Sequence, residues 1–168
     1  MNVKVVNFIF ILFSVSTLLL AGEKRAITFE DFFSMQRLGD VKVSPDGELV
    51  AYTLSIPNID ENKIFTNIWI INLKTRETKQ FTECEKSSSG PAWSPDGKYL
   101  YYNHAGQIWK KALSGEEAVQ VTDFASGASG TVFNTKGSKF LFTSEVYPEC
   151  PDEDCNKKKL EEVENSKV

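Results

Sequence analysis

Apolar residues are most concentrated near the amino terminus, where positions 8–20 read FIFILFSVSTLLL. Lys4 is the only charged residue before this run, and the small residues Ala21 and Gly22 follow it. A weakly positive start, an apolar middle and a small-residue end make up the order of a secretory signal. The run is shorter than the about 20 apolar residues that a membrane-spanning helix needs. We therefore expect a signal peptide at 1–22 that is removed on export, with an uncleaved anchor as the alternative.

Farther along the chain, apolar positions recur with a period of two, which is typical of β-strands. After each of three turn glycines, the third and fifth residues are apolar or aromatic: Val50 and Tyr52, Leu100 and Tyr102, Phe140 and Phe142. Most of the residues between them are apolar as well. A strand that is apolar on both faces must be covered on both faces. The pattern therefore predicts sheets that stack between neighbouring sheets.

A repeat of 40 residues underlies this pattern. Residues 67–93 align with 107–133 without a gap, and the same shift carries 90–103 onto 130–143. The first unit is ten residues longer, around SIPNIDENKIF at 55–65. Because that segment contains a proline and several polar residues, we interpret it as a loop insertion.

Four short strands in a repeat of this length are typical of a β-propeller blade. The sequence therefore predicts an all-β fold, an incomplete β-propeller with blades at about 41–90 and 91–130 and the first hairpin of a third at 131–144. Because propellers close with about 4–8 blades, this chain is not expected to close a ring by itself. Beyond the signal segment, we divide the chain into a lead-in helix and turn at 23–40, a partial propeller at 41–155 and a charged tail at 156–168.

Two Ser-Pro-Asp-Gly segments precede the strands, and such a segment is either a turn or a site for a metal or phosphate. Proline fixes φ for a type I turn, aspartate bonds nearby backbone amides, and glycine takes the left-handed conformation. The third copy, 134–137, keeps only the glycine, a loss that a turn tolerates better than a ligand site. We therefore predict structural turns, with no metal or cofactor site, at Ser44, Pro45, Asp46, Gly47, Ser94, Pro95, Asp96, Gly97 and Gly137.

The cysteines are Cys84, Cys150 and Cys155. In an exported chain a disulfide is the first interpretation, and Cys150 and Cys155 enclose only PDED, so their bridge would be local. Free thiols, or a metal site that includes the acidic residues between them, are the alternatives. A zinc site usually has four ligands, and no others are visible nearby. Cys84 is left without a partner.

The charge balance argues against a nucleic-acid partner. The formal net charge of −4 becomes −5 once Lys4 is removed with the signal, and the sequence has no basic block. After signal cleavage we expect no stable membrane insertion.

Both ends of the mature chain have helical character. Thr28 and Asp31 resemble a weak capping box, and three phenylalanines follow on one face, Phe29, Phe32 and Phe33. We expect residues 37–40 to end this helix through Gly39, and its aromatic face to pack under the first blade or, alternatively, on a second domain. The tail at 156–168 favours a solvated helix or disorder over a binding element.

Two segments carry a resemblance to a known family. ITFEDFFSMQRLGDVKVSPDGELVAYT at 27–53 resembles the start of the mature chain in exported members of the prolyl oligopeptidase family, above all its dipeptidyl-peptidase and acylaminoacyl-peptidase branch. SEVYPECPDEDCNKKK at 144–159 is similar to a propeller segment of those enzymes. The Ser-Pro-Asp-Gly repeat alone is weakly specific, because many exported propellers have it.

The resemblance implies a propeller that caps a C-terminal α/β-hydrolase domain with a serine in a G-x-S-x-G turn, an aspartate and a histidine. The 168 residues contain no G-x-S-x-G turn, and GASG at 127–130 does not fit the spacing. The single histidine, His104, ends a strand and is expected to be structural. No catalytic residue is carried over, so we expect the chain to be inactive alone and to be a fragment.

Two functional hypotheses follow. The favoured one is the non-catalytic, access-limiting propeller region of an exported serine peptidase, whose peptide substrates would be cleaved in the missing hydrolase domain. The alternative is a TolB-like exported propeller that binds or scaffolds without catalysis. An orphan truncation with no activity is a third interpretation.

Overall fold

The structure is a computed structural model that describes residues 25–83 and 86–166. The predicted signal peptide at 1–22 and Cys84 lie outside the described residues. The chain divides into two compact units, one that ends at Phe33 and one that begins at Ser34. Within the described part of the chain, no helix combines the length and the apolar character needed to cross a membrane.

Helix α2 (Phe29–Ser34) starts with a reciprocal cap. The Thr28 N–H donates to Asp31 Oδ2 (2.9 Å), and the Asp31 N–H donates to Thr28 Oγ1 (3.2 Å). Arg25 pairs with the same carboxylate, and these bonds lower the pKa of Asp31 to about 2. The helix buries none of its residues. Its packing under the first blade stays a prediction.

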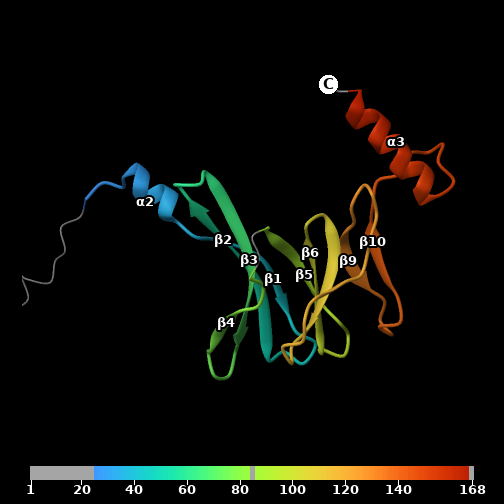
Figure 1. Ribbon diagram of the computed structural model, residues 1–168. Coiled ribbons are helices and arrows are strands. Elements are labelled where there is room, and N and C mark those ends of the chain that lie inside the picture. Colours follow the sequence, from blue (N-terminus) through green and yellow to red (C-terminus); the bar gives the residue numbers. More distant parts are fainter. Residues whose placement is uncertain (1–24, 84–85, 167–168) are drawn as a thin grey trace, which may run out of the picture. The chain divides into compact units, whose positions relative to one another are not determined.

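The second unit is built from antiparallel sheets that follow one another along the chain (Figure 1). The first sheet has the order β1 (Arg37–Val43), β2 (Leu49–Asn58), β3 (Lys63–Asn72), β4 (Thr78–Gln80). The second has the order β5 (Ser88–Trp93), β6 (Tyr99–His104), β7 (Gln107–Ala112), β8 (Val119–Gln120). A two-stranded sheet of β9 (Ser129–Phe133) and β10 (Phe140–Thr143) comes next. The all-β prediction of two blades and the hairpin of a third is confirmed.

Strand β1 corrects the expected end of the lead-in helix. The helix ends at Ser34, and the strand already begins at Arg37, so the segment predicted as a turn at 37–40 pairs with β2. Leu38 lies opposite Leu54, and a bulge between Gly39 and Val41 adjusts the register. Asp40 lies in this bulge with a φ of 31°. Aspartate is common in turns, which explains the prediction of a turn, but the strand continues through this residue.

The insertion at 55–65 is an extended hairpin rather than a loop, which is a second correction. Strands β2 and β3 stay in register to Asn58 and Lys63, and Pro57 lies opposite Ile64. The hydroxyl groups of Ser55 and Thr66 share a hydrogen bond of 2.8 Å across the two strands. Isoleucine and threonine favour strands enough to extend the hairpin past the proline.

The main core lies between the first two sheets. One face of the first sheet contributes Ala51, Ile68 and Ile70, which are at most 2% exposed. The second sheet packs Leu100 and Tyr102 against them, also at most 2% exposed. The opposite face of β6 is covered as well, because Tyr101 contacts two aromatic rings of the third sheet, with centroids 4.9 Å from Phe133 and 5.8 Å from Phe140. The predicted stacking of the second sheet between neighbours is confirmed.

After β10 the described chain continues through a turn into helix α3 (Glu153–Asn165). A disulfide joins Cys150 to Cys155, with Cα atoms 5.3 Å apart, and the Asp152 carboxylate caps the helix by accepting a hydrogen bond from the Cys155 N–H (2.9 Å). The helix therefore begins before residue 156, where the charged tail was placed, and it continues to Asn165.

The start of α3 is fixed to the sheets by Asn156, which is 1% exposed. Its Oδ1 accepts a hydrogen bond from the Tyr147 N–H (3.0 Å), and its Nδ2 donates to Ser126 Oγ (3.5 Å). Glu153 Oε1 accepts a hydrogen bond from the Ala125 N–H (2.6 Å). Only the later turns of the helix are solvated as the sequence predicted.

Candidate functional site: a polar cleft at the strand ends

The first strand of each sheet lies beside the first strand of the next. Strand β5 contacts both β1 and β9, so these three strands form the inner row of the array. In propellers the blades are arranged around a central channel, and the inner strands face it. The positions next to this row are therefore the natural place to look for a path or a binding site.

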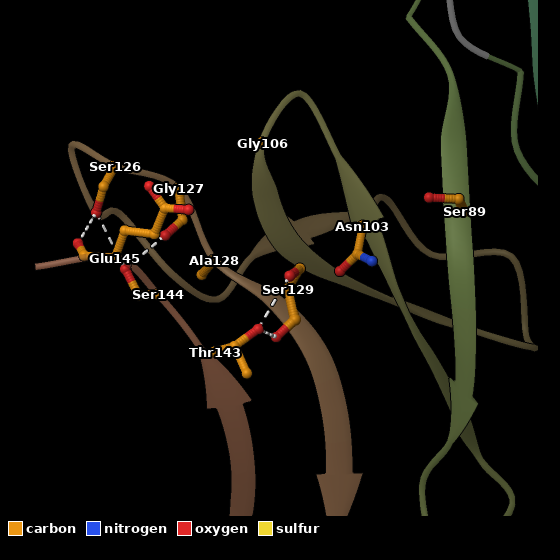
Figure 2. A pocket seen from close by; sticks show the side chains of 10 residues that line it. All are labelled: Ser89, Asn103, Gly106, Ser126, Gly127, Ala128, Ser129, Thr143, Ser144 and Glu145. Atoms are coloured by element: carbon orange, nitrogen blue, oxygen red, sulfur yellow. Dashed lines mark hydrogen bonds between the residues drawn. The ribbon is translucent and has the colours of Figure 1, made fainter.

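A cleft of about 500 Å³ opens where the second sheet meets the third (Figure 2). It lies at the strand ends that carry the β6–β7 turn. Its lining is almost entirely small and polar: Ser89, Asn103, Gly106, Ser126, Gly127, Ala128, Ser129, Thr143, Ser144 and Glu145.

Hydrogen bonds among the lining residues hold the loop before β9 against the end of β10. Ser126 Oγ donates to the Glu145 carbonyl, and Ser144 Oγ donates to the Gly127 carbonyl (2.6 Å). Gly127 has φ 81°, and a Cβ there would lie 2.7 Å from the Gly106 carbonyl oxygen. The close approach of these two turns therefore requires glycine at position 127.

The wall formed by the second sheet carries Ser89 and Asn103, which lie directly opposite each other on β5 and β6 (Figure 2). The Asn103 Oδ1 is buried and accepts no hydrogen bond from the residues that the structure describes. Of the described residues that line the cleft, Glu145 alone is charged. The cleft can therefore exchange hydrogen bonds with a polar chain such as a peptide, and no large apolar or aromatic side chain is among the described residues that line it.

A serine–histidine pair lies beside the cleft, and no motif in the sequence pointed to it. Ser88 Oγ lies 3.2 Å from His104 Nδ1, and the His104 ring packs edge-on against Trp109. Ser88 is 0% exposed, so its hydroxyl cannot reach a substrate. The pair is a buried structural contact, and a nucleophile at this position would need to be exposed.

The Ser-Pro-Asp-Gly segments lie away from the cleft, between β1 and β2 and between β5 and β6. In the second copy, Asp96 Oδ1 accepts hydrogen bonds from Ser94 Oγ (2.6 Å) and the Lys98 N–H (3.1 Å), and Gly97 has φ 70°. These bonds, that of Ser94 first, hold the pKa of Asp96 below its ordinary value. The same bonds form around Asp46, with Gly47 at φ 75°.

In the third copy, different residues make the hydrogen bonds that stabilise the turn. Asn134 Oδ1 accepts a hydrogen bond from the Lys139 N–H (3.2 Å), as Ser94 Oγ does from the Tyr99 N–H (2.9 Å), and Gly137 has φ 68°. Each of these hydrogen bonds lies within its own turn. Among the described residues, no group of three His, Cys, Asp or Glu side chains lies close enough to hold a metal.

The cleft residues were missing from the sequence-based candidates. Small polar residues in turns look like ordinary loop residues, and the cleft forms only when two sheets stack. The glycine- and serine-rich ASGASG at 125–130 is the single local signal that would have pointed to it.

Comparison with known proteins places the architecture in a family. The family described as the dipeptidyl peptidase IV N-terminal region matches residues 44–146. The uncharacterized peptidase YuxL of Bacillus subtilis is 33% identical over 125 residues, which are 71% of this chain and 19% of that protein. The chain thus spans about a fifth of that relative's length.

Solved structures show the same likeness. An acylaminoacyl peptidase of Pyrococcus horikoshii superposes with a TM-score of 0.59 at 27% identity, over 72% of this chain and 19% of that one. A protein assigned as TolB from Agrobacterium tumefaciens gives a TM-score of 0.52 at 26% identity, over 66% of this chain and 39% of that one. The match over 44–146 and the stacked four-stranded sheets lead to one conclusion: the chain belongs to the dipeptidyl peptidase IV N-terminal region family, the propeller region of prolyl oligopeptidase-family peptidases.

Proposed function

We propose that this chain is a non-catalytic propeller region that controls the access of peptides to the hydrolase domain of an exported serine peptidase. The observation that carries the proposal is the polar cleft beside the inner strands, in a chain of this peptidase family. The hydrolase domain, the peptide substrates and export are all part of the proposal.

The chemistry of the cleft suits passage better than tight binding. Sites that retain a ligand are usually lined by apolar and aromatic side chains with a few polar groups. Among the described residues that line this cleft, only Ala128 has an apolar side chain and none is aromatic. Hydroxyl groups such as Ser129 Oγ and Thr143 Oγ1 already bond each other (3.1 Å). A peptide would exchange main-chain hydrogen bonds with the wall at Ser89 and Asn103 without being held by its side chains.

The test uses a chimera in which residues 44–146 replace the matching segment of YuxL. Hydrolysis would be measured on peptides of increasing length, with Ser89→Trp to narrow the cleft and Lys136→Trp, in the exposed β9–β10 turn, as the matched control. We expect Ser89→Trp to lower kcat/KM several-fold for long peptides and little for dipeptide substrates. Identical length profiles for the two variants would refute the access role.

The TolB likeness supports a second candidate, a binding or scaffold propeller without catalysis, because the alignment covers a larger share of that chain. Calorimetric titration with the isolated hydrolase domain of YuxL separates the two candidates. Association favours the peptidase role. An inactive chimera together with no association favours the scaffold.

A further inference from the structure

One wall of the cleft is held by a side chain of helix α3. This wall consists of the lining residues 126–128 and 144–145, and we call it the helix-side wall (Figure 2). Asn156 Nδ2 donates hydrogen bonds to Ser126 Oγ (3.5 Å) and to the Glu145 carbonyl (3.4 Å). Because Asn156 is 1% exposed, these bonds are shielded from water. A single asparagine thus contacts both segments of the helix-side wall.

The disulfide joins the start of this helix to the chain that follows β10. That chain runs from Glu145 to Cys150, whose N–H donates to the Tyr147 carbonyl (2.9 Å). Cys150 is bonded to Cys155, and Asn156 is the next residue along the chain. The disulfide therefore restrains the position of Asn156 relative to the wall segment that it holds.

The helix depends on the contacts at its start. Helix α3 has 13 residues, and an isolated helix of that length is only marginally stable in water. Among its described residues, only Asn156 is buried. The Asp152 carboxylate caps the helix through the Cys155 N–H, and Glu153 Oε1 accepts a hydrogen bond from the Ala125 N–H (2.6 Å). Cap, disulfide and wall contacts thus share residues 152–156, so releasing one of them weakens the others.

The disulfide can be opened without unfolding the sheets. It spans a sequence separation of only 5, and the constraint that a disulfide places on the unfolded chain grows with the length of its loop. Of the described residues in the core between the first two sheets, none is a cysteine. Both Cys150 and Cys155 are partly exposed, and exposed disulfides are typical of those that are reduced readily.

We propose that the Cys150–Cys155 disulfide is a redox-sensitive latch of the cleft: the oxidised pair holds the helix-side wall in place, and reduction by a dithiol releases it. One thiolate of the dithiol attacks a sulfur of the pair and forms a mixed disulfide, and the second thiol then displaces the protein sulfur. The protein gains two thiols and the dithiol becomes a disulfide, so two electrons and two protons pass to the protein.

The consequence for peptides rests on the access function proposed above. In the reduced state Ser126 and Glu145 lose their attachment to the helix start. The Ala128 N–H donates to the Gly106 carbonyl (2.8 Å), which joins the helix-side wall to the β6–β7 turn across the cleft. We expect this bond to open more often after reduction. The reduced protein should then discriminate less between short and long peptides.

The experiment is hydrogen exchange, resolved by residue, on this chain before and after reduction with dithiothreitol. Every sample carries Cys84→Ser, which leaves the pair as the remaining cysteines, and thiol labelling verifies that reduction is complete. The Gly127 and Ala128 amides lie in the helix-side wall and donate hydrogen bonds to Phe124 and Gly106. We expect both amides to exchange several-fold faster after reduction, whereas exchange in β6 stays unchanged.

Asn156→Ala separates the latch from the disulfide, because it removes the wall contacts and keeps both cysteines. The oxidised variant is expected to exchange at Gly127 and Ala128 as fast as the reduced, unaltered chain and to respond little to dithiothreitol. Lys158→Ala, at an exposed position of the same helix, is the matched control and should respond like the unaltered chain. If Asn156→Ala does not fold, Asn156→Asp replaces it, since aspartate accepts the Tyr147 bond but cannot donate to the wall.

Unchanged exchange at Gly127 and Ala128 after complete reduction would overturn the proposal, because the disulfide would then stabilise only its own turn. Exchange that rises equally in β6 would overturn it too, since reduction would then unfold the sheets. Neither result depends on peptide hydrolysis. The Ser89→Trp chimera carries residues 44–146 and therefore neither cysteine of the pair, so a failure of the access function is detected separately.

Discussion

The first two sheets carry similar side chains at equivalent positions, yet they bury them differently. Leu100 and Tyr102 are buried in the second sheet, whereas Val50 and Tyr52 at the same positions of the first are only partly covered. The pairing next to the turn and the turn itself are alike in both sheets. The burial differs because of the neighbouring sheets: the second sheet is covered by the first sheet on one face and by the third sheet on the other. Burial in this chain is thus a property of the stack, as in other repeat proteins whose stability comes largely from contacts between neighbouring repeats.

The largest expected effect tests this comparison directly. Leu100→Ala removes a fully buried side chain between two sheets, and we expect it to lower the free energy of unfolding by about 2–5 kcal/mol. Val50→Ala at the equivalent position should cost at most about 1 kcal/mol, because part of that side chain already faces solvent. Urea denaturation of the two variants measures both values. Equal losses would show that the strand itself, rather than the stack, determines burial.

The third sheet extends the comparison, because the chain after its hairpin is held by a disulfide and by helix α3 as well as by packing between sheets. The cysteine pair closes a loop with a sequence separation of only 5, so the constraint on the unfolded chain is small. The double variant Cys150→Ser, Cys155→Ser is expected to lose at most about 2 kcal/mol.

The effect should also be local. We expect hydrogen exchange to increase at Tyr147 and Ala125, whose amides are held by Asn156 and Glu153 of the helix start. Protection in β6 should stay unchanged. Exchange that increases uniformly through the second sheet would contradict this division between the stacked sheets and the helix.

The repeat, the turns and the period of two could be predicted from the sequence, because each depends on residues that are close along the chain. Pro95, Asp96 and Gly97 specify a turn within four residues, and Leu100 and Tyr102 specify one face of a strand. The extended hairpin was wrongly predicted as a loop, because Pro57 outweighed the isoleucines around it. The proline is tolerated there because the residues before and after it, Ile56 and Asn58, both pair with β3 and hold the hairpin together.

The cleft could not be predicted in the same way. Ser89 and Ser129 are 40 residues apart and come together only because β5 and β9 stack side by side. Asn156 was equally hidden, since one asparagine in a charged helix gives no indication that it is 1% exposed. Local sequence therefore predicted the blades, whereas contacts between blades created the candidate site.

The smallest expected effect concerns the aspartates in the turns of the first two sheets, which the turn of the third sheet lacks. Asp46 and Asp96 accept hydrogen bonds from a serine hydroxyl and a backbone amide, and their pKa values lie below the ordinary value of 3.8. The third turn has Lys136 at this position and uses Asn134 for its contacts, so no carboxylate titrates there. An aspartate whose pKa is lower in the folded state than in the unfolded chain stabilises the fold above the unfolded pKa. That contribution is lost as the pH falls through the folded pKa.

Asp96→Asn should therefore lower the urea midpoint at pH 7 by a small fraction of the Leu100→Ala effect, since the carboxylate lies at the surface. The difference between Asp96→Asn and the unaltered chain should shrink as the pH falls from 5 toward 2, because the aspartate is then protonated. Lys136→Gln in the third turn, which has no carboxylate, is the matched control and should show no such convergence through the same pH window. If the Asp96→Asn difference remained constant across that window, the carboxylate would not be what stabilises the turn, and the Ser94 hydroxyl with its bond to the Tyr99 amide would have to be sufficient.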